Sequence, residues 1–153
     1  MKNKAQSSFE LLVTLSFGLV LLLPVVAIAF IQLASINASL SAIQAQQSSN
    51  KLASVATLVG AEGPPSKQLV EIYVPTGVEA IYVGSATYSL GHEIIFVIRS
   101  PNGLSYVTSY TPVNVSGFLG GASSVGTYLI NVSAESSCPN APAYPCVYIT
   151  EVT

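Results

Sequence analysis

The chain has few charged or catalytic side chains. Only 8% of its 153 residues are charged, against about a quarter in an average soluble protein. Aspartate is absent, His92 is the single histidine, and the formal net charge is −2. Nucleic-acid binding requires a basic patch, which this sequence lacks, so we expect no nucleic-acid partner.

The same scarcity argues against an enzyme and against a metalloprotein. The lone His92 is predicted in a turn beside Glu93, and one histidine cannot supply a multi-histidine metal site or find an aspartate for a triad. The glycines that follow Gly117 are not followed by the lysine and helix start of a phosphate-binding loop. We therefore expect no catalytic residue, no metal and no cofactor.

The two cysteines, Cys138 and Cys146, frame a proline-rich segment near the C-terminus. Their spacing is too wide for a CxxC redox pair, and no companion ligands for zinc are present. An even cysteine count in a chain with an export-like N-terminus favours a disulfide, with two free thiols as the alternative. Closing such a short loop contributes about 2–3 kcal/mol to stability in the chain-entropy model.

The N-terminus changes from basic to apolar within ten residues. Lys2 and Lys4 come first, Glu10 follows, and residues 11–34 contain no charge. About 20 apolar residues span a bilayer as a helix. Gly18 and Pro24 interrupt this segment, and a proline inside a helix removes a hydrogen bond and strains the preceding turn, so we predict a kink there.

A helical pattern continues beyond residue 34 and predicts one helix over residues 8–59. Apolar residues recur at i, i+4 and i+7 in two sets, Ile36, Leu40 and Ile43, and then Leu52, Val55 and Val59. Gly60 and the Gly-Pro-Pro sequence at 63–65 end the helix. We expect no other part of the chain to bury so long a helix, so its partners must be lipid or other molecules.

After residue 65 the pattern changes to strands. Seven short segments rich in Val, Ile and Tyr are separated mostly by Gly or Pro: 69–74, 78–84, 94–99, 104–110, 113–118, 126–133 and 147–152. Such spacing predicts a small antiparallel, immunoglobulin-like β-sandwich, and residues 117–126 a loop with little structure of its own. The fold class is α+β, with a leader (1–5), a long kinked hydrophobic helix (6–60) and a β-sandwich head (61–153).

Three Asn-x-Ser triplets begin at Asn37, Asn114 and Asn131. Asn114 and Asn131 lie in predicted strands of the head and are candidate glycosylation sites if the chain is exported. Asn37 lies on the predicted helix, where we expect packing rather than modification.

Two ordinary interpretations of the N-terminus are open. As a secretory signal, its lysines and apolar core would precede a small-x-small cleavage site at Ala27-Ile28-Ala29, which gives a mature chain that starts at Phe30. As an uncleaved anchor, residues 11–34 would stay in the membrane, with the basic leader inside the cell and the head outside.

A third interpretation is a resemblance. The Gln6-Ser7-Ser8-Phe9-Glu10 sequence resembles the QxSxE processing motif of archaeal class III signal peptides, which belong to type IV pilin-like proteins. Gln6, Ser8 and Glu10 hold its characteristic positions, while Ala5 stands where many relatives have glycine. Residues 75–84 and 126–132 are similar to stretches of archaeal pilin heads.

The resemblance implies cleavage by a prepilin peptidase between Ala5 and Gln6 and a mature chain whose new amine pairs with Glu10 of a neighbouring subunit. It further implies a membrane-held precursor, a homopolymer through the N-terminal helices, an assembly ATPase and platform protein, and an extracellular adhesive filament. An archaellum-type filament subunit and a membrane-anchored surface binding module are the alternatives.

Overall fold

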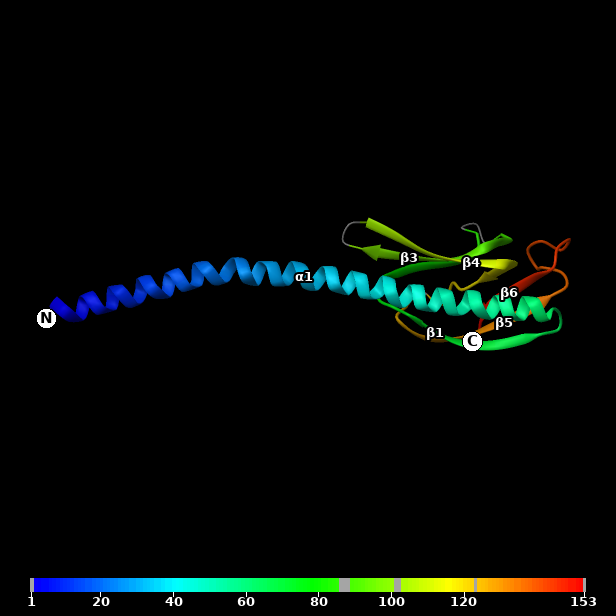
Figure 1. The fold of residues 1–153 in the computed structure, drawn as a ribbon, viewed down its shortest axis with the longest axis horizontal. Coiled ribbons are helices and arrows are strands. Elements are labelled where there is room, and N and C mark those ends of the chain that lie inside the picture. Colours follow the sequence, from blue (N-terminus) through cyan, green and yellow to red (C-terminus); the bar gives the residue numbers. More distant parts are fainter. Residues whose placement is uncertain (1, 86–88, 101–102, 123, 153) are drawn as a thin grey trace. The chain divides into compact units, whose positions relative to one another are not determined.

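The computed structural model describes residues 2–85, 89–100, 103–122 and 124–152, without the side chains of residues 2–8, 34 and 38. One long helix precedes a sheet of six strands, which confirms the α+β class (Figure 1). The chain divides into two compact units, Met1–Asn37 and Ala38–Thr153. The second unit, here called the head unit, begins inside the helix and therefore contains the last part of the helix as well as every strand.

Helix α1 runs from Lys2 to Glu62, beyond the predicted 8–59 at both ends. It is helical without interruption through Gly18 and Pro24, so the predicted kink is not confirmed. A proline lacks only its own backbone N–H, and the hydrogen bonds of the neighbouring turns are enough to keep the helix continuous.

Helix α1 ends at the predicted Gly-Pro-Pro sequence, whereas Gly60, also predicted to end it, is still helical. Gly63 has a φ of 74°, a left-handed conformation that glycine adopts without strain. Its backbone N–H donates to the carbonyl oxygen of Val59 at 3.1 Å, and the Ser66 hydroxyl donates to the same oxygen at 2.9 Å. The helix therefore ends with this carbonyl satisfied before the chain enters the sheet.

All six strands belong to one sheet, so the two sheets of the expected immunoglobulin-like sandwich are not confirmed. The strand order is β1-β5-β6-β4-β2-β3, and every pair is antiparallel except β4 with β6. The strands are β1 (Lys67–Val74), β2 (Val78–Gly84), β3 (Gly91–Ser100), β4 (Gly103–Phe118), β5 (Gly126–Glu135) and β6 (Cys146–Glu151).

Strand β4 unites two segments that the sequence predicts as separate strands. Its first half pairs with β3, and its second half pairs with β6 and β2. The β3–β4 register shifts between the pairs Gly91–Val115 and Glu93–Tyr110, and Pro112 lies within this irregular stretch. A proline is tolerated there because the regular ladder that would need its N–H is interrupted.

The sheet curls around the last part of α1. Strands β1 and β3 stand at opposite ends of the strand order, yet both bond to the helix: the Ser48 hydroxyl donates to the carbonyl oxygen of Tyr73 in β1, and the Ser49 hydroxyl to that of Ile94 in β3. A flat sheet of six strands is about 24 Å wide, much wider than a helix. Only a curved sheet brings both ends to the helix, and Figure 1 shows strands on both sides of it.

The expectation that the whole helix must find partners outside the chain is therefore wrong for its last part. Leu52 and Val59 are buried, as the apolar pattern predicts, whereas Leu40 and Ile43 are half exposed. Most of the buried face consists of small residues that let the helix approach the sheet closely. They are Ser41, Ala45, Ser48, Ser49, Ala53 and Ala56.

The glycine- and serine-rich segment after β4 is more ordered than expected. Leu119 and Ala122 are both buried in the core of the head unit, and the backbone N–H of Ala122 donates to the carbonyl oxygen of Leu119 at 3.2 Å. These two apolar side chains anchor the loop to the core, whereas the composition alone predicts a loop with little structure of its own.

Candidate functional site

The first candidate site is the apolar part of α1 from Phe9 to Leu33, here called the apolar segment. Each of its large apolar side chains is between 49% and 71% exposed, so none is buried within the chain. By length and composition, the helix from Phe9 onward is apolar enough to cross a membrane. A helix surface of this kind is suited to burial in lipid or against other helices.

The two hydroxyl side chains of the apolar segment are satisfied within the helix. The Thr14 hydroxyl donates to the carbonyl oxygen of Glu10 at 2.6 Å, and the Ser16 hydroxyl donates to that of Leu12 at 2.8 Å. Such bonds let hydroxyl groups enter an apolar environment. Glu10 itself is exposed, and among the described residues no side chain pairs with its carboxylate. Glu10 is thus the one charged group of the segment that still needs a partner.

The predicted cleavage site lies in the first turns of α1. The backbone of Ala5, Gln6 and Ser8 is helical, while the side chains of these three residues lie outside the described part of the structure. Gln6 and Glu10 are four residues apart, one helical turn, so both lie on the same side of the helix.

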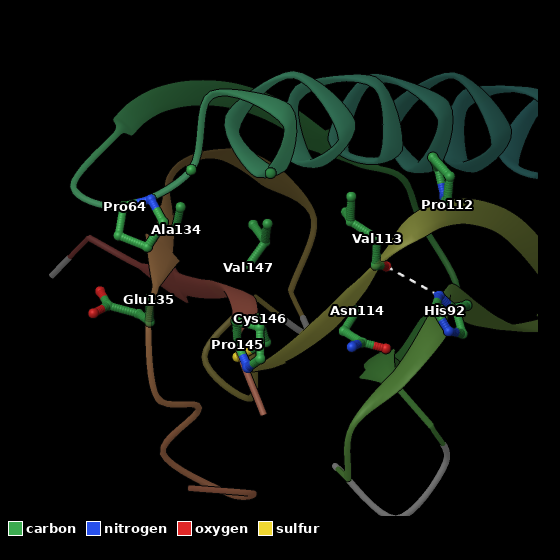
Figure 2. Close-up of a pocket in the computed structure, with 12 residues that line it drawn as sticks. Pro64, His92, Pro112, Val113, Asn114, Ala134, Glu135, Pro145, Cys146 and Val147 are labelled. Atoms are coloured by element: carbon green, nitrogen blue, oxygen red, sulfur yellow. Dashed lines mark hydrogen bonds between the residues drawn. The ribbon is translucent and has the colours of Figure 1, made fainter. Parts of the chain in front are cut away.

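The second candidate site is a cleft in the head unit of about 280 Å³, here called the head cleft (Figure 2). Pro64, Pro112 and Pro145 supply much of its apolar wall. Figure 2 shows these prolines reaching it from three segments: the turn after α1, strand β4 and the segment before β6. The wall is therefore assembled from distant parts of the sequence, which no local motif predicts.

The polar groups of the head cleft are His92, Asn114 and Glu135. The His92 ring nitrogen Nδ1 lies 3.1 Å from the carbonyl oxygen of Val113, which fixes Nδ1 as the protonated nitrogen because the carbonyl only accepts. Glu135 accepts a hydrogen bond from the Ser133 hydroxyl at 2.9 Å. These groups can bind a small polar ligand, and they include no nucleophile with an adjacent base.

The predicted disulfide between Cys138 and Cys146 is present, with 5.4 Å between the two Cα atoms. The loop it closes is held by further bonds: the backbone N–H of Cys138 donates to the carbonyl oxygen of Tyr144, and the Asn140 amide to the Ser116 hydroxyl. Cys146 also lines the head cleft, so the disulfide fixes one wall of it.

The structure places both candidate glycosylation sites in strands. Asn114 lies in β4 beside the head cleft, and Asn131 lies in β5, opposite residues of β1 and β6. Both asparagines are partly exposed, but the serines of their triplets, Ser116 and Ser133, are buried. The folded head therefore leaves room at the asparagines while it covers the hydroxyl groups that the triplets require.

In the part of the chain that the structure describes, no three His, Cys, Asp or Glu side chains come together in a way that would hold a metal ion. Comparison with family models, with curated proteins and with solved structures finds no match to this chain.

Proposed function

We propose that the chain is a type IV pilin-like subunit of an extracellular, adhesive filament of archaeal type. The observation that carries this proposal is the exposed apolar segment on a chain whose head unit has a core of its own. Burying a Leu or Phe side chain contributes about 1.5–3 kcal/mol. Packing such segments together from many copies supplies the free energy of assembly, and the heads then form the outside of the filament.

In this proposal a prepilin peptidase cuts between Ala5 and Gln6. The cut removes Lys2 and Lys4, which hold the precursor in the membrane, and keeps the whole apolar segment. The new amine at Gln6 of one subunit pairs with the carboxylate of Glu10 in the next, which offsets the cost of burying both charges. Gly18 and Pro24 provide the position at which the helix bends on packing.

The proposed filament is a cell-surface glycoprotein that mediates attachment. Its other partners are the assembly ATPase and the platform protein, and the precursor resides in the cytoplasmic membrane. Glycans at Asn114 and Asn131 would be added before the head folds, because Ser116 and Ser133 are buried afterwards.

The test is to replace Glu10 by Gln in cells that produce the protein and to image sheared surface fibres by electron microscopy. Losing one partner of a buried ion pair costs about 3–5 kcal/mol, so we expect the fibre yield to fall more than about tenfold. The matched control is Glu62→Gln, at the exposed far end of α1, which should leave the yield unchanged. Normal fibres from the Glu10→Gln variant would rule out the pairing.

A second candidate is a membrane-anchored surface module that binds a small ligand, and the head cleft favours it. In that case the protein stays with the membrane, or is released as a chain that starts at Phe30, and sheared fibres do not contain it. An archaellum-type subunit would also form fibres, and those fibres would rotate rather than adhere.

A further inference from the structure

The two edges of the curled sheet differ in how their backbone is protected. One edge is β1, and the other is the first half of β4, which pairs with β3. On β1, the side of the strand that does not pair with β5 is capped by α1. The Ser48 hydroxyl donates to the carbonyl oxygen of Tyr73 at 2.6 Å, and the Lys51 ammonium group donates to that of Glu71 at 2.7 Å. Two of the acceptors that an added strand would use on this edge, the carbonyl oxygens of Glu71 and Tyr73, are therefore occupied.

The first half of β4, residues 103–110, has no such protection. It pairs with β3 on one side, and no described strand pairs with its other side, here called the open edge. Alternate backbone N–H and C=O groups of a strand point toward each side, so the open edge presents unpaired donors and acceptors. Natural sheets usually guard such an edge with lysine, proline or a bulge. Residues 103–110 contain no charge and no proline, and their pairing with β3 is regular.

The open edge carries large, uncharged side chains. Leu104, Tyr106 and Tyr110 are between 51% and 68% exposed, and Thr108 is also exposed. All four alternate along the strand and therefore lie on one face. An exposed strand edge of this composition favours the addition of another strand.

We propose that the open edge pairs with the open edge of a second copy of this chain, antiparallel and about a two-fold axis at Thr108. On the exposed face the residues nearest to Thr108 are symmetric about it, because Tyr106 and Tyr110 stand two positions to either side. Antiparallel pairing therefore sets tyrosine opposite tyrosine and threonine opposite threonine, and both are favourable cross-strand pairs. No like charges meet, since β4 has no charged residue.

The proposed contact at the open edge joins two copies and does not extend to a third. The bonds from α1 to the carbonyl oxygens of Glu71 and Tyr73 hinder the addition of a strand to that part of β1. The unpaired part of β2 before Tyr82 is short, and Glu79 is engaged by Arg99. A two-fold contact uses the same surface on both partners and ends with the dimer. Neighbours along a helical filament are related by a screw rotation instead, so this contact joins heads of different filaments. The proposed contact goes beyond the filament proposal, because two copies that are not part of a filament can form it as well.

The first test is cross-linking of the full chain, purified in detergent with fewer than one chain per micelle. Directly opposed residues of antiparallel strands have Cα atoms about 4.5–5.5 Å apart, within disulfide range. Thr108→Cys should form a disulfide-linked dimer under a mild oxidant about tenfold faster than Thr127→Cys, because pairing raises the local thiol concentration. Thr127 is a matched control, an exposed threonine in β5. Equal rates for the two variants would overturn the proposal.

The second test changes the charge of the edge without a thiol. Thr108→Lys places two ammonium groups opposite each other at the two-fold axis, so the full chain in the same detergent should sediment as a monomer. Wild type and Thr127→Lys should sediment as dimers. A monomeric wild type, or a dimeric Thr108→Lys variant, contradicts pairing at the open edge. The comparison does not depend on fibres, so it can fail while the filament proposal stands.

Discussion

The two parts of α1 have opposite chemistry within one continuous helix. From Phe9 to Leu33 the helix carries large apolar side chains on every side, and all of them are exposed. From Ser41 to Val59 its buried face consists mainly of Ala and Ser, and hydroxyl groups bond it to strands at both ends of the sheet order.

The difference separates assembly from folding. The second part of α1 contributes to a core that the chain builds by itself, and its small residues let the sheet close around it. The first part contributes nothing to that core, so its burial is available only to lipid or to other copies. A substitution in one part should therefore leave the property that depends on the other part unchanged.

The largest expected effect comes from a matched pair of leucines. Leu52→Ala removes a fully buried side chain from the core of the head unit and should lower its free energy of unfolding by about 2–5 kcal/mol. Leu22→Ala, at a position 60% exposed, should leave that free energy unchanged. Urea denaturation of the full chain in detergent, followed by tyrosine fluorescence, measures both. If Leu22→Ala also destabilised the head unit, the two parts of α1 would not have separate roles in assembly and folding.

Removing the disulfide should have the next largest effect. The double substitution Cys138→Ser and Cys146→Ser releases the loop beside the head cleft and should cost the head unit about 2–3 kcal/mol. Reduction of the wild-type protein serves as the control, and the reduced protein should have the same denaturation midpoint as the double variant. A midpoint that does not move in either sample contradicts a stabilising role for this loop.

A pair of glycines sharpens the comparison. A Cβ on Gly117 would lie 2.1 Å from the backbone oxygen of Ile149, so Gly117→Ala should push β4 from β6 and cost about 1–3 kcal/mol. Gly18 has no atom within 4 Å of a built Cβ. Gly18→Ala should instead raise the helix propensity of the apolar segment by about 1 kcal/mol. Circular dichroism of both full-length variants during thermal unfolding tests the contrast, which fails if they lose equal stability.

The smallest effect involves two serines that each donate one hydrogen bond. Ser48→Ala removes the bond from α1 to the carbonyl oxygen of Tyr73 and should destabilise the head unit by about 1 kcal/mol. Ser16→Ala removes only a bond to the preceding turn of the same helix and should not change the stability of the head. Amide hydrogen exchange of β1 distinguishes them: faster exchange is expected for the Ser48 variant alone.

Local signals in the sequence predicted much of the fold. The bounds of β2 match the predicted 78–84, the glycine and prolines after residue 62 end α1, and the even cysteine count predicted the disulfide. Each of these depends on residues close together in the chain, so composition and periodicity carry the information.

The arrangement of the strands could not be predicted in this way. The buried face of α1 consists mainly of Ala and Ser, which carry no strong apolar periodicity, so its packing against the sheet was not predicted. The strand order, the merging of two segments into β4 and the head cleft all depend on contacts between distant residues. The processing motif formed by Gln6, Ser8 and Glu10 remains a prediction, because a separate protein, the peptidase, would recognise it.

The most direct test of the filament proposal is the identity of the first residue in sheared surface fibres, determined by mass spectrometry of the N-terminal peptide. A chain that starts at Gln6 with a free α-amine is the predicted result, since it keeps the apolar segment, Glu10 and the amine proposed to pair with Glu10. A chain that starts at Phe30 would contradict the account, because most of the segment proposed to form the filament core would be gone.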